Sequence, residues 1–218
     1  MPEQVLLDND VALKVACYSL VDEMIAVTTF DQTSPAMLGV GRFVIRGRLG
    51  RAANIADVPR AKAALEQLLK AVTLLEPDDE ELAVAADLEV EASRRALELD
   101  GGESQLLAIL ATRECRLLIT GDKRAIAAMA LVAPLLAANR IGCLEQLMAQ
   151  LVVTSGVDFV RPLVCGEPRV DRAITSCFGC SGGQVDRKDV LAGLSSYISH
   201  LDRSAPGMLV LEFGVTAG

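Results

Sequence analysis

CRLLITGDKRAIAAM (residues 115–129) places an apolar run, an acid and a helical pattern in direct succession. The run LLIT predicts a buried strand, and Asp122 ends it just before a helix that begins at Lys123. VLLDND (5–10) has the same organisation, with Asp8 and Asp10 ahead of an apolar helical pattern from Val11. Strands that alternate with helices predict a mainly parallel α/β sheet covered on both faces.

Other stretches extend this pattern. MIAVTTF (24–30) is rich in β-branched residues and predicts a second strand, AVTLLEP (71–77) a further strand or extended segment, and RIGCLEQ (140–146) a short final strand. Helices are predicted from Asp57, from Asp78 and over 104–115, whereas residues 31–56 have no clear periodicity. Residues 1–150 therefore form the predicted α/β domain, and 151–218, richer in glycine and cysteine, a largely helical extension packed on the same domain.

The composition limits the classes of function. Of the 218 residues, 51% are hydrophobic but only 3% aromatic, so the core consists mainly of Ala, Leu, Val and Ile. A net charge of −8 argues against a broad, non-specific grip on nucleic acid, but an acidic site that holds metal remains compatible with it. The sequence predicts no membrane-spanning segment and no signal peptide, so a soluble cytoplasmic protein is expected, with its six cysteines reduced.

Carboxylates lie where strands end and helices begin. Asp8, Asp10 and Asp122 follow predicted strands, Glu103 lies in DGGES (100–104) at a helix start, and Glu145 lies near the end of RIGCLEQ. Because parallel strands bring their carboxyl ends to one edge of a sheet, these acids are expected to converge there. Converging carboxylates repel each other unless a divalent cation lies between them, which indicates metal-dependent phosphate chemistry.

Three of these segments, VLLDND, DGGESQLLAILA and LLITGDKRAIAAM, resemble in order the motifs of the PIN-domain family of metal-dependent ribonucleases. The resemblance covers roughly residues 1–150 and implies a three-layer α/β/α sandwich. It implies that Asp8, Glu103 and Asp122 are catalytic metal ligands for Mg²⁺ or Mn²⁺, with Asp10 and Glu145 as further candidate ligands. The implied activity is endoribonuclease hydrolysis of RNA, often as the toxin of a toxin–antitoxin pair, with an antitoxin or other protein as partner and pairing into a homodimer.

The chain departs from the family in one region. PIN nucleases carry an additional acid on an early helix, but PAMLGVGRFVIRGRLGR (35–51) contains no Asp or Glu. Its arginines, together with the bases after Asp122, are candidates for holding substrate phosphates. These candidate substrate-binding residues are Arg42, Arg46, Lys123 and Arg124. The missing acid also leaves open a degenerate PIN-like module that uses the fold for interaction and not for catalysis.

Helix capping, a second enzyme family and a zinc site are competing interpretations. Asp8 or Asp10, Asp122, and the pair of Asp100 with Glu103 could act only as helix caps. Asp8-Asn9-Asp10 also resembles the opening of haloacid-dehalogenase-like phosphatases, although the later acid of that family is missing here and Lys62 and Lys70 are loose candidates for its lysine. Cys177-Phe-Gly-Cys180, with Cys165 and His200, has the components of a zinc site, but its irregular spacing favours reduced thiols and a surface histidine.

Overall fold

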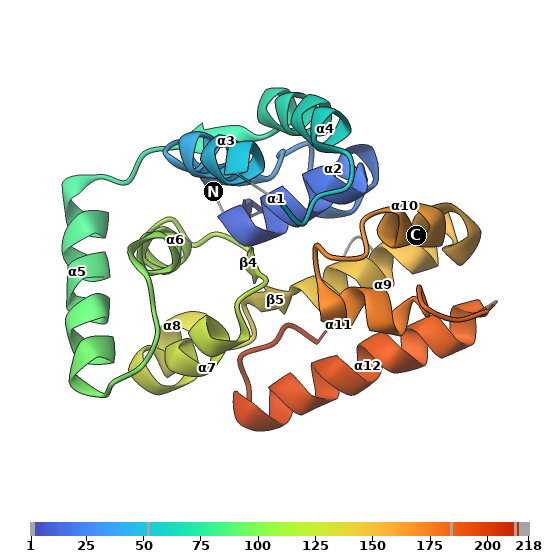
Figure 1. Cartoon of the computed structure of the whole chain (residues 1–218). Coiled ribbons are helices and arrows are strands. Elements are labelled where there is room, and N and C mark those ends of the chain that lie inside the picture. Colours follow the sequence, from blue (N-terminus) through green and yellow to red (C-terminus); the bar gives the residue numbers. More distant parts are fainter. Residues whose placement is uncertain (1–2, 52, 184, 212, 214–218) are drawn as a thin grey trace.

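Five short parallel strands form the centre of the molecule in the computed structural model, which describes residues 3–51, 53–183, 185–211 and 213 (Figure 1). The strand order is β3-β2-β1-β4-β5, and each neighbouring pair is parallel. Leu6 of β1 is level with Ala36 of β2 on one side and Leu118 of β4 on the other. The strands are β1 (Val5–Leu7), β2 (Ala36–Leu38), β3 (Thr73–Leu75), β4 (Leu117–Thr120) and β5 (Ile141–Cys143).

Helices follow the strands and make up most of the described chain. The first group is α1 (Asn9–Tyr18), α2 (Val21–Thr28), α3 (Gly41–Arg51), α4 (Val58–Ala71), α5 (Asp79–Arg94) and α6 (Gly101–Thr112). The second is α7 (Lys123–Val132), α8 (Pro134–Ala137), α9 (Leu144–Ser155), α10 (Val157–Gly166), α11 (Arg172–Cys177) and α12 (Arg187–Ser204). None of the helices in the part of the chain described here is long and apolar enough to cross a membrane.

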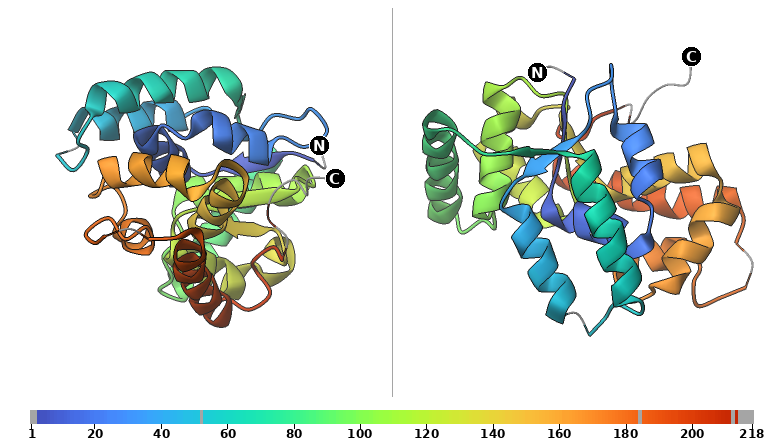
Figure 2. Two further views of the ribbon diagram at one scale, coloured as in Figure 1. Left: turned by 90° about the vertical axis from the view of Figure 1, so that its right-hand side faces the viewer. Right: turned by 90° about the horizontal axis from the view of Figure 1, so that it is seen from above.

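The sheet is buried on both faces, which makes the fold a three-layer α/β/α sandwich. Val5 and Leu7 of β1 belong to one hydrophobic cluster, whereas Leu6 between them belongs to the other. This alternation follows from the two-residue period of a strand. The first cluster packs β1 and β4 against α1–α4, α9–α11 and the start of α12. The second packs the opposite face against α5–α8 and the end of α12. Figure 2 shows the two sets of helices on either side of the strands.

The prediction of a strand at MIAVTTF is wrong, because these residues lie mostly in α2. Met24, Val27 and Thr28 are buried at the three- and four-residue spacing of a helix face, and the Thr28 hydroxyl donates to the Met24 carbonyl at 2.7 Å. Burial on one helix face here outweighs β-branched propensity. The second strand is instead β2, three residues long, inside the stretch without periodicity.

Residues after 150 share the core with those before it. The boundary drawn at residue 150 falls inside α9, which runs from Leu144 to Ser155. Leu151, Val160 and Phe178 belong to the same cluster as Val5 and Leu7 of β1. The residues after 150 therefore belong to the structure that supports the sheet.

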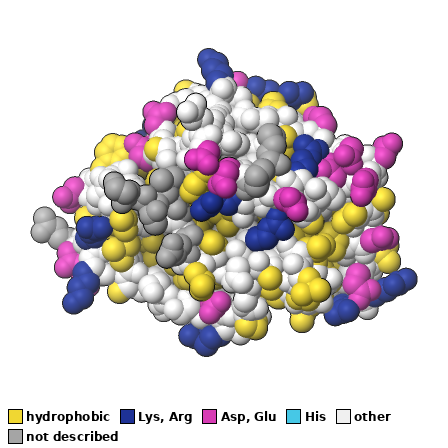
Figure 3. All heavy atoms as spheres, turned by 180° about the vertical axis from the view of Figure 1, so that it is seen from behind, with side chains coloured by type: hydrophobic (Ala, Val, Ile, Leu, Met, Phe, Trp, Pro, Cys, Tyr) yellow, Lys and Arg dark blue, Asp and Glu magenta, His cyan; other side chains and the backbone are white. Residues whose placement is uncertain are grey.

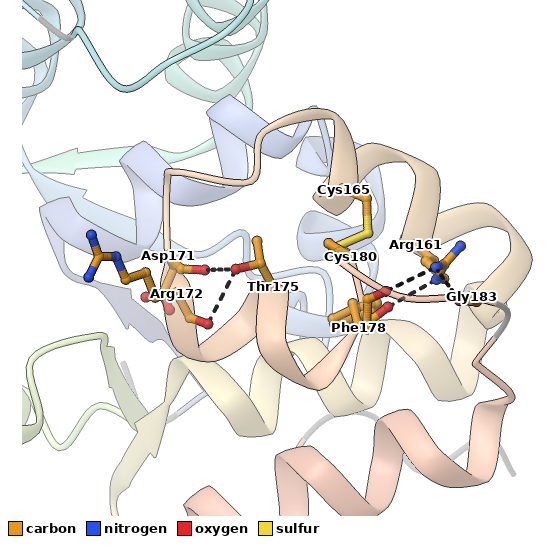
Figure 4. The surroundings of a disulfide bond; sticks show 9 residues. Arg161, Cys165, Asp171, Arg172, Thr175, Phe178, Cys180 and Gly183 are labelled. Carbon is orange, nitrogen blue, oxygen red and sulfur yellow. Dashed lines mark hydrogen bonds between the residues drawn. A yellow bond between two sulfur atoms is a disulfide. The ribbon is translucent and has the colours of Figure 1, made fainter.

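A disulfide corrects the expectation that every cysteine is reduced. Cys165 at the end of α10 is bonded to Cys180, which follows α11, so the bond closes a loop with a sequence separation of 15 (Figure 4). Cys177 remains a buried free thiol, so CFGC is not a zinc pair. Beside the bond, the Arg161 guanidinium donates to the carbonyl oxygens of Phe178, Gly179 and Gly183. Because disulfides are typical of oxidising compartments, the cytoplasmic location stays a prediction.

Candidate functional site: a carboxylate cavity at the strand ends

A cavity of about 770 Å³ opens at the carboxyl ends of β1 and β4. We call it the carboxylate cavity, because acids from separate junctions of strand and helix line it together with a few bases. Its charged lining residues are Asp8, Asp10, Asp100, Glu103, Asp122, Lys14, Arg48 and Arg124. Of the five acids expected at this edge of the sheet, Asp8, Asp10, Glu103 and Asp122 line the cavity.

Asp8 joins the two central strands to α1. Its carboxylate caps α1 by accepting from the backbone N–H groups of Asn9 at 2.6 Å and Asp10 at 3.3 Å. The Thr120 hydroxyl of β4 lies 3.4 Å from Asp8 Oδ2 and accepts from the Asp122 N–H at 3.1 Å. Asp8 is only 7% exposed, and burial, reinforced by the charge of Asp10, raises its pKa to about 6.

Glu103 enters the cavity from the first turn of α6. Its Oε2 accepts from the Asp100 N–H at 3.1 Å, while Asp100 Oδ1 accepts from the Glu103 N–H at 2.9 Å, which completes a capping box. Glu103 is 6% exposed. Burial is the main cause that raises its pKa to about 8, and the charges of Asp100, Asp8 and Asp122 add to it.

Asp122 differs from the other two acids in its electrostatics. It caps α7, accepting from the N–H groups of Arg124 at 2.8 Å and Ala125 at 3.3 Å, and the Arg124 guanidinium also donates to it. Burial acts to raise its pKa, but the hydrogen bonds from Arg124 and Ala125 outweigh it, so the pKa of Asp122 is lowered. The capping interpretation is confirmed, since Asp8, Glu103 and Asp122 each take part in a helix cap, and the same three residues line one cavity.

Lys14 is a site residue that sequence reasoning missed. Its Nζ lies 2.6 Å from Asp10 Oδ2 and 2.7 Å from Asp171 Oδ2, and its side chain is only 13% exposed. Burial alone would lower the pKa of Lys14, but the two carboxylates raise it, so the ammonium is charged. The four-residue spacing of Asp10 and Lys14 on a helix was a visible signal. Nothing in the sequence connected Lys14 with Asp171, which lies far along the chain.

Gly121 explains why the strand end at β4 can approach α1 so closely. A Cβ at residue 121 would overlap Oδ2 of Asp10 and would lie 3.4 Å from Nζ of Lys14. Any larger residue at 121 would therefore require the Asp10 carboxylate to move from its position beside Lys14. The glycine of ITGD is part of the cavity wall.

Four candidate residues do not line this cavity. Glu145 is buried at the start of α9 and pairs with Lys123, whose Nζ lies 2.5 Å from Glu145 Oε1 and above the ring of Tyr197. Arg46 forms a bidentate pair with Glu66 of α4. Arg42 lies over the ring of Phe43. This part of the wall consists instead of Val44 and Arg48 of α3 and of Val40, which immediately precedes the helix.

The carboxylates do not form a ready-made metal centre. Across the residues that the structure describes, no group of three or more His, Cys, Asp or Glu side chains lies close enough to hold a metal ion. Asp8, Glu103 and Asp122 are directed instead toward backbone N–H groups of the caps. A cation could join them only after their side chains turn into the cavity.

Comparisons with protein-family models, with curated proteins and with solved structures find no match to this chain. The resemblance to PIN domains therefore rests on the three quoted motifs.

Proposed function

We propose that the protein is a PIN-like endoribonuclease that depends on Mg²⁺ or Mn²⁺ and hydrolyses RNA phosphodiesters in the carboxylate cavity. One observation carries the proposal: Asp8, Glu103 and Asp122 come from three separate helix starts and line one cavity at the edge of a parallel sheet. Ligands of open α/β sheets bind at this edge. Hard oxygen donors of this kind suit Mg²⁺ and Mn²⁺.

The residues of the chain have distinct roles in this proposal. Asp8, Glu103 and Asp122 are the residues that would hold the cation, and their side chains would have to leave the cap hydrogen bonds to do so. When bound, the cation would supply an activated water and neutralise charge on the scissile phosphate. Lys14, fixed by Asp10 and Asp171, places a positive charge at the cavity wall, where it stabilises the phosphate oxygens. Binding of a protein antitoxin and formation of a homodimer are also proposals, and they rest on the resemblance to the family alone.

A degenerate PIN-like interaction module is the second candidate. The observation that favours it is the wall formed by Val40, Val44 and Arg48 in the region where the family carries an additional acid. In this candidate function the cavity binds a ligand and performs no hydrolysis. The phosphatase gains no comparable support, because Lys62 and Lys70 are exposed on α4 and are not among the residues that line the cavity.

A Mn²⁺ titration followed by thermal denaturation tests the metal site. We expect millimolar Mn²⁺ to raise the melting temperature of the wild type and not that of Asp8→Asn, which keeps a capping side chain. Asp186→Asn, the same change at the exposed cap of α12, is the matched control and should retain the shift. An unchanged wild-type melting temperature, or an equal shift in Asp8→Asn, would refute the metal site.

Cleavage then separates the two candidates. With Mn²⁺ and a labelled RNA, the nuclease produces fragments that EDTA prevents and that Asp8→Asn does not form. A protein that binds Mn²⁺ and leaves every RNA intact is the interaction module.

A further inference from the structure

A loop closed by the disulfide contacts the carboxylate cavity from the second half of the chain. The bond joins Cys165 to Cys180, and we call residues 166–179 between them the closed loop. Within it, Oδ2 of Asp171 lies 2.7 Å from Nζ of Lys14, which lines the cavity. Figure 4 shows Asp171 at the start of α11 and the disulfide beyond the end of this helix. The disulfide and the ion pair are therefore connected through one short helix.

The closed loop also holds the segment that follows α3. Glu167 is fully buried, and its carboxylate accepts from the backbone N–H groups of Ala56 at 2.6 Å and Asp57 at 2.8 Å. The Asn54 amide donates to the Arg169 carbonyl at 3.3 Å. Because α3 forms part of the cavity wall, the closed loop supports the cavity at a second place.

The ion pair between Lys14 and Asp171 differs from the charges on the molecular surface. On the face shown in Figure 3, acidic and basic side chains are interspersed and open to solvent. The side chains of Lys14 and Asp171 are only 13% and 18% exposed. Breaking a largely buried pair leaves a charge without its counter-ion, which is strongly unfavourable. The position of Lys14 therefore depends on where the closed loop holds Asp171.

The closed loop has little regular structure of its own. Its helix, α11, is six residues long, and helices this short are not stable without external support. Residues 167–171, which make the contacts described above, lie between α10 and α11. The end near the disulfide is anchored, because Ile174 and Phe178 belong to the core and the Arg161 guanidinium donates to the Phe178 carbonyl at 2.9 Å. Opening the bond is therefore expected to loosen residues 167–171 while the core stays folded.

The disulfide is more accessible than the free thiols of the protein. Cys165 and Cys180 are partly exposed, and each lines a cavity of its own, of about 400 Å³ and about 300 Å³. The free cysteines among the described residues are all buried: Cys17, Cys115, Cys143 and Cys177. A small thiol reagent therefore reaches the bond between Cys165 and Cys180 first, and exposed disulfides are the ones that exchange readily.

We propose that the bond between Cys165 and Cys180 is a redox switch, which a dithiol reductant opens to release the closed loop from the cavity. A thiolate of the reductant attacks one Sγ atom, the S–S bond breaks, and the other Sγ leaves as a thiolate that takes up a proton. The second thiol of the reductant then displaces the first cysteine, which leaves as a thiol, and the reductant becomes a disulfide. The electron pair and the protons of the dithiol thus pass to the protein.

The switch acts on the site of the proposed function, and in this respect the inference rests on that function. In the oxidised protein the closed loop holds Asp171 against Lys14 and Glu167 against the segment after α3. In the reduced protein both contacts loosen, so the positive charge of Lys14 at the cavity wall is no longer fixed in place.

The test compares the oxidised full chain with the same protein in a dithiol buffer, without RNA or metal ion, after a thiol count has shown that the bond is open. Hydrogen exchange at the amides of Ala56 and Asp57 should become about tenfold faster, because the bond no longer restricts the loop. Acetylation of Lys14, measured by mass spectrometry relative to the exposed Lys62, should become about fivefold faster.

Two variants serve as controls. The double variant Cys165→Ala, Cys180→Ala lacks the bond and should show the fast exchange and fast acetylation in both buffers. Cys115→Ala removes a buried free thiol and keeps the disulfide, so it should respond to the dithiol as the wild type does. The amides of Asp78 and Glu81, in the capping box of α5, should exchange equally in both buffers.

Unchanged exchange at Ala56 and Asp57 with unchanged acetylation of Lys14 in the reduced protein would overturn the switch. A dithiol that leaves the bond intact in the folded protein would also overturn it. An equal acceleration at Asp78 and Glu81 would show that the bond stabilises the whole fold and does not control the closed loop. Because these measurements need neither Mn²⁺ nor RNA, they decide the switch even where the Mn²⁺ titration or the cleavage assay refutes the nuclease.

Discussion

Glu103→Gln should make the protein more stable at neutral pH. The glutamine keeps an oxygen that accepts from the Asp100 N–H, and it removes the charge that burial and the neighbouring acids disfavour. Glutamate has a pKa near 4.5 when the chain is unfolded and about 8 in the folded protein. Because the raised pKa lets the folded state keep a proton that the unfolded chain loses, stability falls as pH rises from about 4.5 to about 8.

The magnitude follows from this window. Each pH unit within it costs about 1.4 kcal/mol, so at pH 7 the wild type loses about 3 kcal/mol that Glu103→Gln retains. For a chain of this length, that difference corresponds to a rise in melting temperature of about 6–12 °C. The loss of stability that comes from burying an ionisable carboxyl at residue 103 is consistent with a functional role, since sites often sacrifice stability.

Thermal denaturation followed by circular dichroism at pH 4, 7 and 9 measures the effect. The advantage of Glu103→Gln should disappear at pH 4, where both states of the wild type are protonated, and should be largest at pH 9. Glu80→Gln, at an exposed position of α5, is the control and should lie within about 0.5 kcal/mol of the wild type at each pH. A destabilised Glu103→Gln, or a gain that does not vary with pH, would contradict the electrostatic account of the cavity.

Three further predictions concern two ion pairs and the disulfide. Glu81 is 1% exposed, and its contacts with Arg113 and Thr112 hold its pKa at about 2. Glu81→Gln should therefore lower the free energy of unfolding by about 3 kcal/mol at pH 7. Urea denaturation at several pH values should show this difference shrinking as pH falls from about 4.5 towards 2. Cys180→Ser opens the loop closed by Cys165 and should cost about 3 kcal/mol in oxidising buffer, with no difference from a wild type that is fully reduced first. Asp171→Asn keeps the cap of α11 and removes one counter-ion of Lys14, for an expected loss of about 1–3 kcal/mol; in a double-mutant cycle with Lys14→Met the two changes should be clearly non-additive, and simple additivity would show that the pair is not coupled.

The sequence was most informative where local rules decide the structure. Asp8 and Asp122 could be placed at strand ends because an apolar run, an acid and a helical pattern follow each other within a few residues. The structure confirms the strands β1 and β4 and shows that the two acids cap the helices that follow, α1 and α7. The pair of Asp100 and Glu103 could be named as a helix cap for the same reason, and the structure shows a complete capping box there.

Local rules failed where a partner lies far along the chain. A strand was predicted at 24–30 because burial of Met24 and Val27 against other helices cannot be seen in the segment itself. The bond between Cys165 and Cys180 has no signature that separates it from free thiols, and Asp171 could not be connected to Lys14 by spacing. Arg48 could be separated from Arg46 only once α3 and its contact with Glu66 were known.

The ion pair between Lys14 and Asp171 also sets the order in which the cavity can be completed during protein synthesis. A nascent chain that ends at residue 150 already contains Asp8, Glu103 and Asp122. Of the two carboxylates that hold Lys14 in the finished protein, however, this chain contains Asp10 and lacks Asp171. The loop after α3 likewise reaches its final position only when Glu167 can accept from the backbone N–H groups of Ala56 and Asp57. A chain truncated before residue 171 would therefore contain the acids of the site and lack one of the two carboxylates that hold Lys14.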